Sequence, residues 1–194
     1  MFIVFEGLDG SGQSTQARLL KDYLELERNL SVVLTKEPTD KPPIGELIRK
    51  ILKKEISVSP LSLQLLFCAD RSEHLEKVIK PALEKNQWVI SDRYFYSTIA
   101  YGSLNLNLEW LIKLNEQFLI PDIVFLLKAR PEICLQRIDQ NRGQRQFFEE
   151  EKKLEKVWRA YEILSRKFSN IIKVIDGEKS IEEAHQEIIK NFKF

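Results

Sequence analysis

A glycine-rich turn near the N-terminus constrains the fold of this chain more than any other feature. It follows an apolar run, Phe2 to Glu6, that predicts a buried strand, and it leads into a helical segment from about Ser14. Its three glycines can adopt positive φ, so backbone N–H groups and the helix dipole can converge on an anion. Strand, glycine-rich turn and helix, in that order, are typical of a phosphate-binding loop (P-loop). The sequence therefore predicts a site for the phosphates of ATP at Gly7, Leu8, Asp9, Gly10, Ser11, Gly12, Gln13, Ser14 and Thr15.

The loop departs from the usual motif at one position. Gln13 stands where a lysine ammonium normally reaches the β- and γ-phosphates, and Ser14 supplies the hydroxyl that helps to hold Mg²⁺. An amide can hydrogen-bond to phosphate, but it cannot neutralise charge in a transition state. Nucleotide binding is therefore the stronger prediction and fast catalysis the weaker one. The plainest alternative is an ordinary glycine-rich turn after an edge strand.

Short apolar runs alternate along the chain with longer segments of helical period, which is typical of a parallel sheet covered by helices. The predicted strands are Phe2 to Glu6, Ser31 to Thr35, Trp88 to Ser91, Ile123 to Leu127 and Ile171 to Ile175. The predicted helices are about Ser14 to Glu27, Ile44 to Lys54, Leu61 to Lys85, Leu108 to Phe118, Pro131 to Asp139, Glu150 to Lys167 and Ile181 to Asn191. We expect one α/β domain over residues 1–194, a three-layer P-loop NTPase fold whose five-stranded parallel sheet has helices on both faces.

Composition argues against several other classes. The 30 Lys and Arg against 29 Asp and Glu leave a net charge of +1, which offers no excess of positive charge to hold a nucleic-acid backbone. There is no apolar stretch long enough to span a bilayer, and the N-terminus has neither a basic region nor a cleavage site. Cys68 and Cys134 lack metal-binding spacing, so we expect two buried free thiols. We expect a cytoplasmic protein without nucleic-acid or membrane partners.

A carboxylate and a guanidinium follow the predicted strand Trp88 to Ser91. Asp92 and Arg93 would therefore lie at the carboxyl end of a parallel strand, where open α/β sheets bind their ligands. A carboxylate there can hold Mg²⁺ directly or through water, and a guanidinium can clamp phosphate with two hydrogen bonds. A surface salt bridge is the alternative, and it would be favoured if the chain had no P-loop.

The stretch FEGLDGSGQSTQ resembles the opening of thymidylate kinases, and further matches follow in the order that this family shows. They are Lys36-Glu37-Pro38, Leu66 to Arg71, Asp92-Arg93-Tyr94, Ser97 and Ala100-Tyr101. The resemblance covers essentially the whole chain. It implies an enzyme that transfers the γ-phosphoryl group of ATP to dTMP, giving dTDP and ADP in dTTP biosynthesis, with Mg²⁺ as cofactor. It also implies a homodimer.

The resemblance implies roles for residues around the acceptor nucleotide. Phe67 would stack on thymine and Arg71 would bond a base carbonyl; the two are four apart, so they share a helix face. Tyr101 would form a second wall that excludes a ribose 2′-OH, Ser97 would line the site, and Asp9 would lie near the sugar and phosphate. Without the resemblance, Phe67 and Tyr101 would be read as core aromatics and Arg71 as a solvated arginine.

The resemblance also implies a phosphate and metal region. Lys36 stands where the family usually has an arginine that clamps phosphate, so the charge is kept but the two-pronged geometry is lost. Glu37 would lie near the metal or its water shell. The predicted Mg²⁺ set is thus Ser14, Glu37 and Asp92.

A polar segment of about 139–151 looks like a mobile lid between two helices. Position 10 is glycine where one thymidylate kinase subtype has an arginine, so this chain resembles the subtype whose lid supplies the catalytic charge. Arg142 and Arg145 are the catalytic candidates of the lid, with Arg137 one helical turn earlier. The full predicted catalytic set is Asp9, Gln13, Asp92, Arg93, Arg142 and Arg145. Phe147-Phe148-Glu149 replaces the family's usual Arg-Phe-Glu, so Gln13 is not the only altered cationic position.

Two other functions stay open on the sequence. A kinase for another nucleotide would keep the P-loop and Asp92-Arg93, but Phe67, Arg71 and Tyr101 favour a thymine pocket. A catalytically weak or silent nucleotide-binding paralogue is favoured by Gln13 alone. A signalling GTPase is disfavoured because the chain has no Asn-Lys-x-Asp guanine-reading motif.

Overall fold

The computed structural model describes residues 1–142 and 151–192, with side chains for 1–140 and 151–192. Its sheet runs in the order β2-β3-β1-β4-β5, and all neighbouring strands pair in parallel. The strands are β1 (Phe2–Gly7), β2 (Val32–Lys36), β3 (Trp88–Asp92), β4 (Ile123–Lys128) and β5 (Ile172–Asp176). The predicted five-stranded parallel sheet is confirmed, with small shifts at the strand ends.

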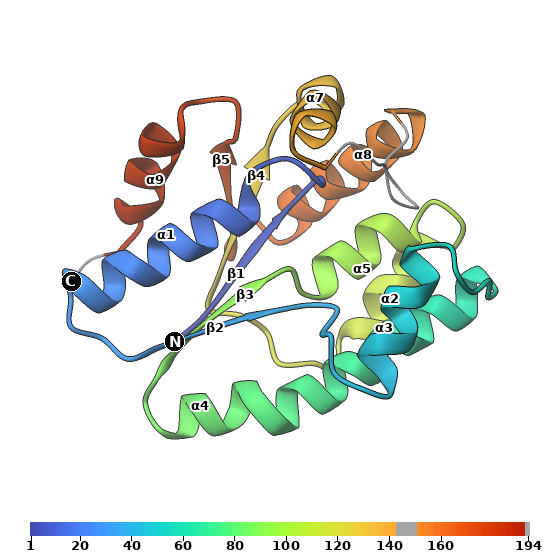
Figure 1. The fold of residues 1–194 in the computed structure, drawn as a ribbon, viewed down its shortest axis with the longest axis horizontal. Helices are drawn as coiled ribbons and strands as arrows, with labels where there is room; N and C mark the ends of the chain where they lie inside the picture. Colours follow the sequence, from blue (N-terminus) through green and yellow to red (C-terminus); the bar gives the residue numbers. More distant parts are fainter. Residues whose placement is uncertain (143–150, 193–194) are drawn as a thin grey trace.

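Helices cover both faces of the sheet (Figure 1). On one face lie α1 (Gln13–Leu26) and α9 (Ile181–Ile189), whose apolar side chains share a core with alternate residues of β1 and β4. The opposite core takes residues from α2 (Ile44–Leu52), α3 (Pro60–His74), α4 (Lys80–Glu84), α5 (Phe95–Gly102), α6 (Leu108–Asn115), α7 (Pro131–Arg142) and α8 (Glu151–Lys167). In the described residues, no helix is both long and apolar enough to cross a membrane.

Strand β1 is buried along its whole length and therefore shows no polar alternation. Ile3 and Phe5 pack toward α1 and α9, whereas Phe2 and Val4 pack into the opposite core. This alternation follows from the two-residue period of a strand. The loop after β1 is consequently held at the centre of the sheet by apolar side chains on both faces.

The predicted helix Leu61 to Lys85 is a helical segment with a defect. Between α3 and α4 lies a π-helical turn, η1 (Leu75–Ile79). Pro81 stands at the start of α4, where its missing N–H breaks the α-helical hydrogen-bond ladder. The hydrophobic period of the sequence does not reveal such a turn, because the helix continues through it without a break.

Helix α5 was not predicted from the sequence, where no helix was expected between Ser91 and Leu108. All eight residues of α5 are buried. A helix buried on every side has no polar face, so its sequence shows no amphipathic period. This omission matters because α5 carries Ser97 and Tyr101.

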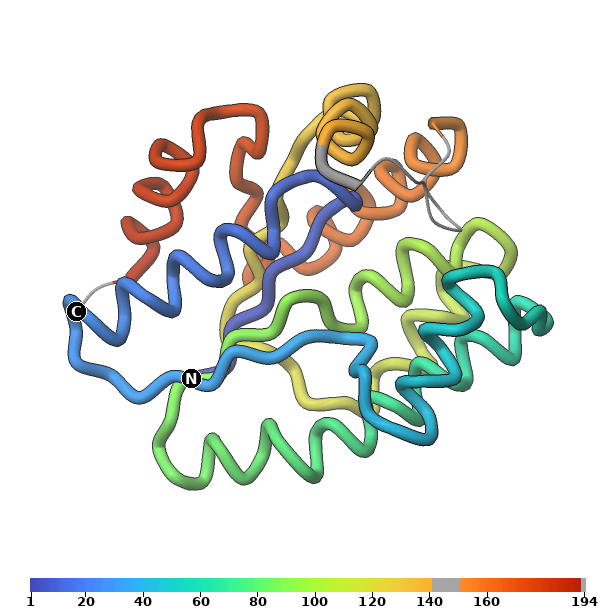
Figure 2. Tube along the Cα trace, viewed as in Figure 1, coloured from blue at the N-terminus to red at the C-terminus, as the bar shows by residue number. Residues whose placement is uncertain are grey.

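Three strand ends come together at one edge of the sheet (Figures 1 and 2). Asp92 pairs in register with Lys36 on one side and with Phe5 on the other. The loop after β1 therefore lies beside the ends of β2 and β3. Carboxyl ends of parallel strands are where open α/β sheets form ligand sites.

Candidate active site

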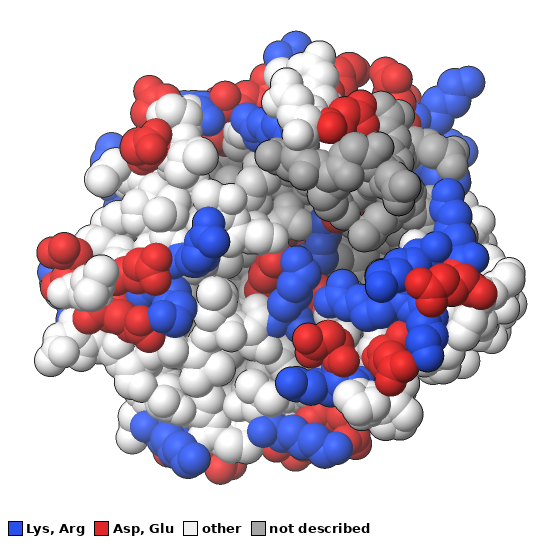
Figure 3. Space-filling view, viewed as in Figure 1, with Lys and Arg blue, Asp and Glu red and all other residues white. Residues whose placement is uncertain are grey.

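A cavity of about 800 Å³ opens at this edge of the sheet. Lys and Arg side chains gather in and around a hollow on the face shown in Figure 3. The predicted site residues that line the cavity are Asp9, Gly10, Ser11, Gly12, Gln13, Ser14, Thr15, Lys36, Glu37, Phe67, Arg71, Arg93, Ser97 and Tyr101. Segments far apart in the sequence thus meet in one cavity large enough for small-molecule ligands.

Two glycines of the loop are needed for different reasons. Gly10 has φ +84°, and a Cβ there would lie 2.4 Å from the Cys134 carbonyl oxygen in α7. Gly12 has φ +101°, yet a Cβ there would meet no atom within 4 Å. Gly10 therefore permits close packing of α7 on the loop, whereas Gly12 supplies only the backbone turn before α1.

We predict that Gly10→Ala destabilises the protein more than Gly12→Ala. Both changes place a side chain in the left-handed region, at about 1–2 kcal/mol. Only Gly10→Ala also forces α7 away, which adds about 1–3 kcal/mol of overpacking. Urea unfolding of the two variants checks this, with Gly12→Ala as the matched control. Equal losses of unfolding free energy would contradict the packing role of Gly10.

The hydroxyl, carboxylate and ammonium predicted around the phosphates lie in contact. The Ser14 hydroxyl donates to Asp92 Oδ2 at 2.6 Å, and Lys36 Nζ donates to the same oxygen at 2.7 Å. Asp92 is 5% exposed, and its Oδ1 is buried without a hydrogen-bond partner in the structure. A buried carboxylate with one unsatisfied oxygen, beside a hydroxyl, is a suitable ligand set for a hard cation.

Glu37 is placed differently. Its Oε2 accepts from Arg71 Nε at 2.9 Å, and its Oε1 lies 3.0 Å from His74 Nδ1. Glu37 is 4% exposed, so both of its oxygens are used inside the protein. Its predicted place near a metal is not supported by any free oxygen in this structure.

Arg71 lines the cavity and is 1% exposed. Besides Glu37, it donates from Nη1 to Asn115 Oδ1 at 2.9 Å and from Nη2 to Thr98 Oγ1 at 2.7 Å. Phe67, one helical turn earlier on α3, also lines the cavity. Thr98 and Asn115 were not predicted from the sequence, since each belongs to a helix remote from α3 in the chain.

Asp9 joins the loop to α5. Its Oδ2 accepts from the Tyr101 hydroxyl at 2.8 Å, and its backbone N–H donates to the same hydroxyl at 3.1 Å. Its Oδ1 accepts from Arg93 Nη2 at 2.9 Å. The guanidinium carbon of Arg93 lies 5.4 Å from the centre of the Tyr101 ring. The polar end of Tyr101 is therefore fixed against the loop.

Glu6 is a buried carboxylate directly under the loop that the sequence analysis missed. It is fully buried, and its Oε1 accepts the backbone N–H groups of Tyr94 at 2.9 Å and Ser97 at 3.1 Å. Its Oε2 accepts from the Ser97 hydroxyl and from Tyr161 Oη at 3.0 Å. Burial raises the pKa of Glu6 to about 7, an effect that the charge of Arg93 only partly offsets.

We predict that Glu6 makes stability fall as pH rises. Its pKa is 4.5 ordinarily and about 7 in the folded protein, so between these values the folded state holds the proton better. The loss of unfolding free energy between pH 4.5 and 8 is about 3 kcal/mol for such a shift. Glu6→Gln cannot titrate, so this part of the fall in unfolding free energy with pH should be absent. The stability of the variant relative to the parent should therefore be higher at pH 8 than at pH 4.5. Urea unfolding at several pH values decides, and identical slopes would contradict the prediction.

Arg49 is a further cavity residue that the sequence analysis did not single out. This half-buried side chain of α2 lines the cavity and donates to the carbonyl oxygens of Pro38 and Thr39. In the sequence, an arginine in a helix of mixed charge is typical of a solvated surface residue. Only the approach of α2 to the end of β2 places it in the cavity.

The predicted lid is covered only in part. Arg142 is the last residue of α7, and its side chain is outside the description. Arg145 and Phe147 to Glu149 lie outside the described residues. Arg137 lines the cavity, and its Nη1 donates to the Gly177 carbonyl at 2.8 Å.

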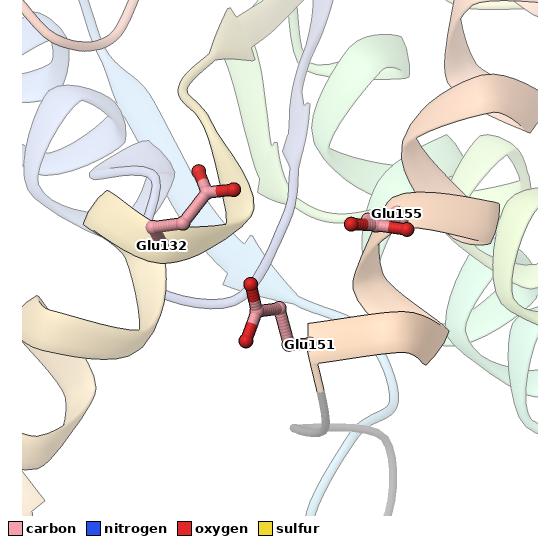
Figure 4. A group of neighbouring side chains, drawn as sticks. All are labelled: Glu132, Glu151 and Glu155. Carbon is pink, nitrogen blue, oxygen red and sulfur yellow. The ribbon is translucent and has the colours of Figure 1, made fainter.

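Three glutamates of α7 and α8 approach one another (Figure 4). Glu132 of α7 and Glu151 and Glu155 of α8 have carboxylate oxygens within 4.8 Å of one another. All three are exposed, and exposed acidic groups commonly lie so without an ion. We assign no function to this cluster.

Three features define the class of this protein. A phosphate loop follows the central strand of a parallel sheet, the Ser14 hydroxyl bonds to the Asp92 carboxylate beside the loop, and Phe67 and Arg71 line the same cavity. The protein is a P-loop kinase of small substrates, with the predicted P-loop NTPase fold.

The chain belongs to the thymidylate kinase family, whose model, described as "Thymidylate kinase", matches residues 5–188. It is 44% identical to a Thermococcus kodakarensis protein named "Probable thymidylate kinase", over 97% of this chain and 95% of that one. It is 39% identical to the "Thymidylate kinase" of Plasmodium falciparum, over 97% of this chain and 88% of that one. The crystal structure of thymidylate kinase from Ehrlichia chaffeensis superposes with a TM-score of 0.80 at 32% identity, covering 100% and 98% of the two chains.

Proposed function

We propose that this protein transfers the γ-phosphoryl group of ATP to dTMP and releases dTDP and ADP. The observation that carries the proposal is that one cavity joins the phosphate loop to Phe67 and Arg71 in a chain of the thymidylate kinase family. The direct test is chromatography of dTDP formed from MgATP and dTMP, with dCMP, dGMP and dAMP as competing acceptors. Preferential phosphorylation of another nucleotide would contradict the proposal.

The two ends of the cavity divide between the two substrates. The acceptor base would lie against Phe67 and Tyr101, with Arg71 and Thr98 at its polar edge. Since Ser97 bonds both Glu6 and Arg93, it supports this half from below. The nucleoside of ATP would lie at the other end of the cavity, which is lined by Arg137, Gly177, Lys179 and Ser180.

The reaction needs positioning and charge stabilisation rather than a covalent enzyme intermediate. An oxygen of the dTMP phosphate bonds to the γ-phosphorus as the bond from that phosphorus to ADP breaks. The loop N–H groups hold the donor phosphates, and Lys36, Arg49 and Arg93 supply positive charge around the transferring group. Arg142 and Arg145 stay the proposed lid cations.

Mg²⁺ is proposed as the cofactor, held by Ser14 and Asp92. The buried unpartnered oxygen of Asp92 fits a divalent cation, and the Lys36 ammonium on its other oxygen shows that this carboxylate attracts positive charge. The metal would supply charge neutralisation for the phosphates. Glu37 would act only through water or after leaving Arg71 and His74.

The alternatives are not favoured. A silent paralogue rests on Gln13 alone, whereas 36–44% identity to proteins named thymidylate kinase extends over nearly the whole chain. That alternative requires that Gln13→Lys form dTDP while the parent protein does not. A kinase for another nucleotide would show up as faster turnover of a non-thymine acceptor.

Homodimerisation and a cytoplasmic location stay proposals. Leu61 and Leu65 lie one turn apart on α3 and are 45% and 47% exposed, and Trp110 of α6 is 40% exposed. Exposed apolar side chains of this size are suitable for a subunit interface. Sedimentation of the parent and Leu65→Lys would test the assembly; a parent monomer would contradict it.

A further inference from the structure

The amide of Gln13 has one orientation that satisfies all its neighbours. In that orientation its NH₂ group donates to Ser11 Oγ at 2.6 Å and to the Leu8 carbonyl at 2.9 Å. Its oxygen accepts from Arg93 Nη2 at 2.5 Å and from Arg93 Nε at 3.1 Å. Gln13 is 5% exposed, so these contacts are made away from bulk water. The residue in the place of the usual lysine is therefore bound to an arginine.

The guanidinium of Arg93 is hydrogen-bonded on all its sides. Nη1 donates to the Gly7 carbonyl at 2.9 Å and to Ser97 Oγ at 2.8 Å, and Nη2 also donates to Asp9 Oδ1 at 2.9 Å. With the contacts to Gln13, all five N–H donors of the fork are used. A guanidinium bonded in this way has a single position, under the phosphate loop.

The backbone of Arg93 adopts a strained conformation at this position. Its φ is +73°, in the left-handed region that a non-glycine residue rarely adopts. The Ser91 hydroxyl donates to the Arg93 carbonyl at 2.7 Å, and the Arg93 N–H donates to the Phe5 carbonyl at 2.9 Å. Such strain persists only where the surroundings hold the residue, and it concentrates at functional sites.

Lysine and glutamine differ in their hydrogen-bonding groups, and only glutamine can make the contacts seen at position 13. An ammonium has three donors and no acceptor, so a lysine at position 13 could not accept from Arg93. A glutamine has both an acceptor for Arg93 and donors for the loop carbonyl. We propose that Gln13 is a positioning residue whose amide holds Arg93 against the phosphate loop, where Arg93 supplies the positive charge that lysine supplies in the usual motif.

The charge of Arg93 is secure in this buried place. Burial alone would lower the pKa of Arg93, but the charge of Asp9, together with smaller effects of Tyr101, Tyr161 and Asp92, outweighs burial, and the pKa lies well above its ordinary value. Arg93 also lines the cavity, so its charge would face phosphates bound there. What the charge acts on, a transferring phosphoryl group, rests on the proposed function.

The first experiment is a mutant cycle on dTDP formation, with kcat and KM measured for both substrates. Gln13→Met should lower kcat by about 10- to 100-fold, as loss of a supporting partner does elsewhere, with little change in the KM for dTMP. In an Arg93→Met background, Gln13→Met should cost less than about threefold, because residues that act as a unit are not additive. Gln13→Glu, which keeps the acceptor, should retain more activity than Gln13→Met.

Gln13→Lys distinguishes the proposal from the alternative that the chain has merely lost the P-loop lysine and that Gln13 has no role of its own. With Arg93 present, the variant loses the acceptor and places two cations together, so its kcat should fall below that of the parent. Combined with Arg93→Met, it should instead exceed the Arg93→Met single variant. The proposal would be overturned if Gln13→Met lowered kcat as much in the Arg93→Met background as in the parent. A Gln13→Lys enzyme with a higher kcat than the parent would also overturn it.

The second experiment does not depend on turnover. The Arg93 Nε–H signal in a ¹⁵N NMR spectrum, assigned by its loss in Arg93→Lys, should shift and exchange faster in Gln13→Met but remain protected in Gln13→Glu. Gln16→Met is the matched control, since the Gln16 amide donates to the Ile181 carbonyl and its loss should leave the signal unchanged. An unchanged Arg93 signal in Gln13→Met overturns the inference. If the parent forms no dTDP but the signal responds, the proposed function fails and the Gln13–Arg93 contact stands.

Discussion

Replacing Asp92 with alanine is expected to lower kcat for dTDP formation by about 10²- to 10³-fold, the loss typical of removing one preorganised charge-stabilising group. Asp92 is the carboxylate that Ser14 and Lys36 share, and its second oxygen is buried without a partner. Without it, Ser14 remains but the negative charge that would hold Mg²⁺ is lost. The measurement is the rate of dTDP formation across a magnesium titration.

Asp92→Asn is the informative companion variant. Its amide keeps the size of the side chain and an oxygen for Lys36, but it lacks the charge that a hard cation requires. It should therefore lose nearly as much activity as Asp92→Ala while unfolding at close to the parent temperature. An Asp92→Ala enzyme within about tenfold of the parent rate, well short of that typical loss, would show that the carboxylate does not act in the reaction.

The second large effect is on stability: Arg71→Met should cost about 3–5 kcal/mol, because it leaves a buried carboxylate without its cation. Arg71 is 1% exposed and Glu37 is 4% exposed, with 2.9 Å between Nε and Oε2. For a chain of this size, 1 kcal/mol shifts the unfolding temperature by about 2–4 °C, so a fall of roughly 10 °C is expected. Urea and thermal unfolding measure it.

An exposed arginine–glutamate pair in the same chain provides the control. Arg130 and Glu178 lie 2.8 Å apart, but the arginine side chain is 69% exposed. Arg130→Met should therefore lose far less stability than Arg71→Met, because water screens an exposed ion pair. Adding Glu37→Gln to Arg71→Met should recover part of the lost stability. If Arg71→Met and Arg130→Met lose the same amount, the buried pair does not hold α3 to the end of β2.

The strands and the loop could be predicted because their signals are local. The run from Phe2 to Gly12 contains an apolar strand followed at once by glycines, and each inference uses neighbouring residues only. The position of Asp92 at a strand end was predictable for the same reason. Its contact with both Ser14 and Lys36 could not be predicted, since it depends on the register of three strands.

The missed parts of the site depend on burial and on distant packing. Helix α5 has no exposed face, so no periodicity identifies it. Glu6 reads as the polar end of a strand, and only the packing of α5 and α8 around it makes it a buried carboxylate bonded to Ser97 and Tyr161. Thr98 and Asn115 have no signal at all until α5 and α6 pack beside Arg71.

The sequence by itself determined the class of sheet, the phosphate loop and the family, because hydrophobic period, glycine positions and short motifs are properties of neighbouring residues. Only the tertiary structure decided what Gln13 does. Along the chain, a glutamine in place of lysine indicates a lost charge. The fold, however, brings its amide oxygen to 2.5 Å from Arg93 Nη2, although the two residues are 80 positions apart in the sequence. Hydrogen bonds join groups that are close in space, and the packing of β1 against β3 brought these two together.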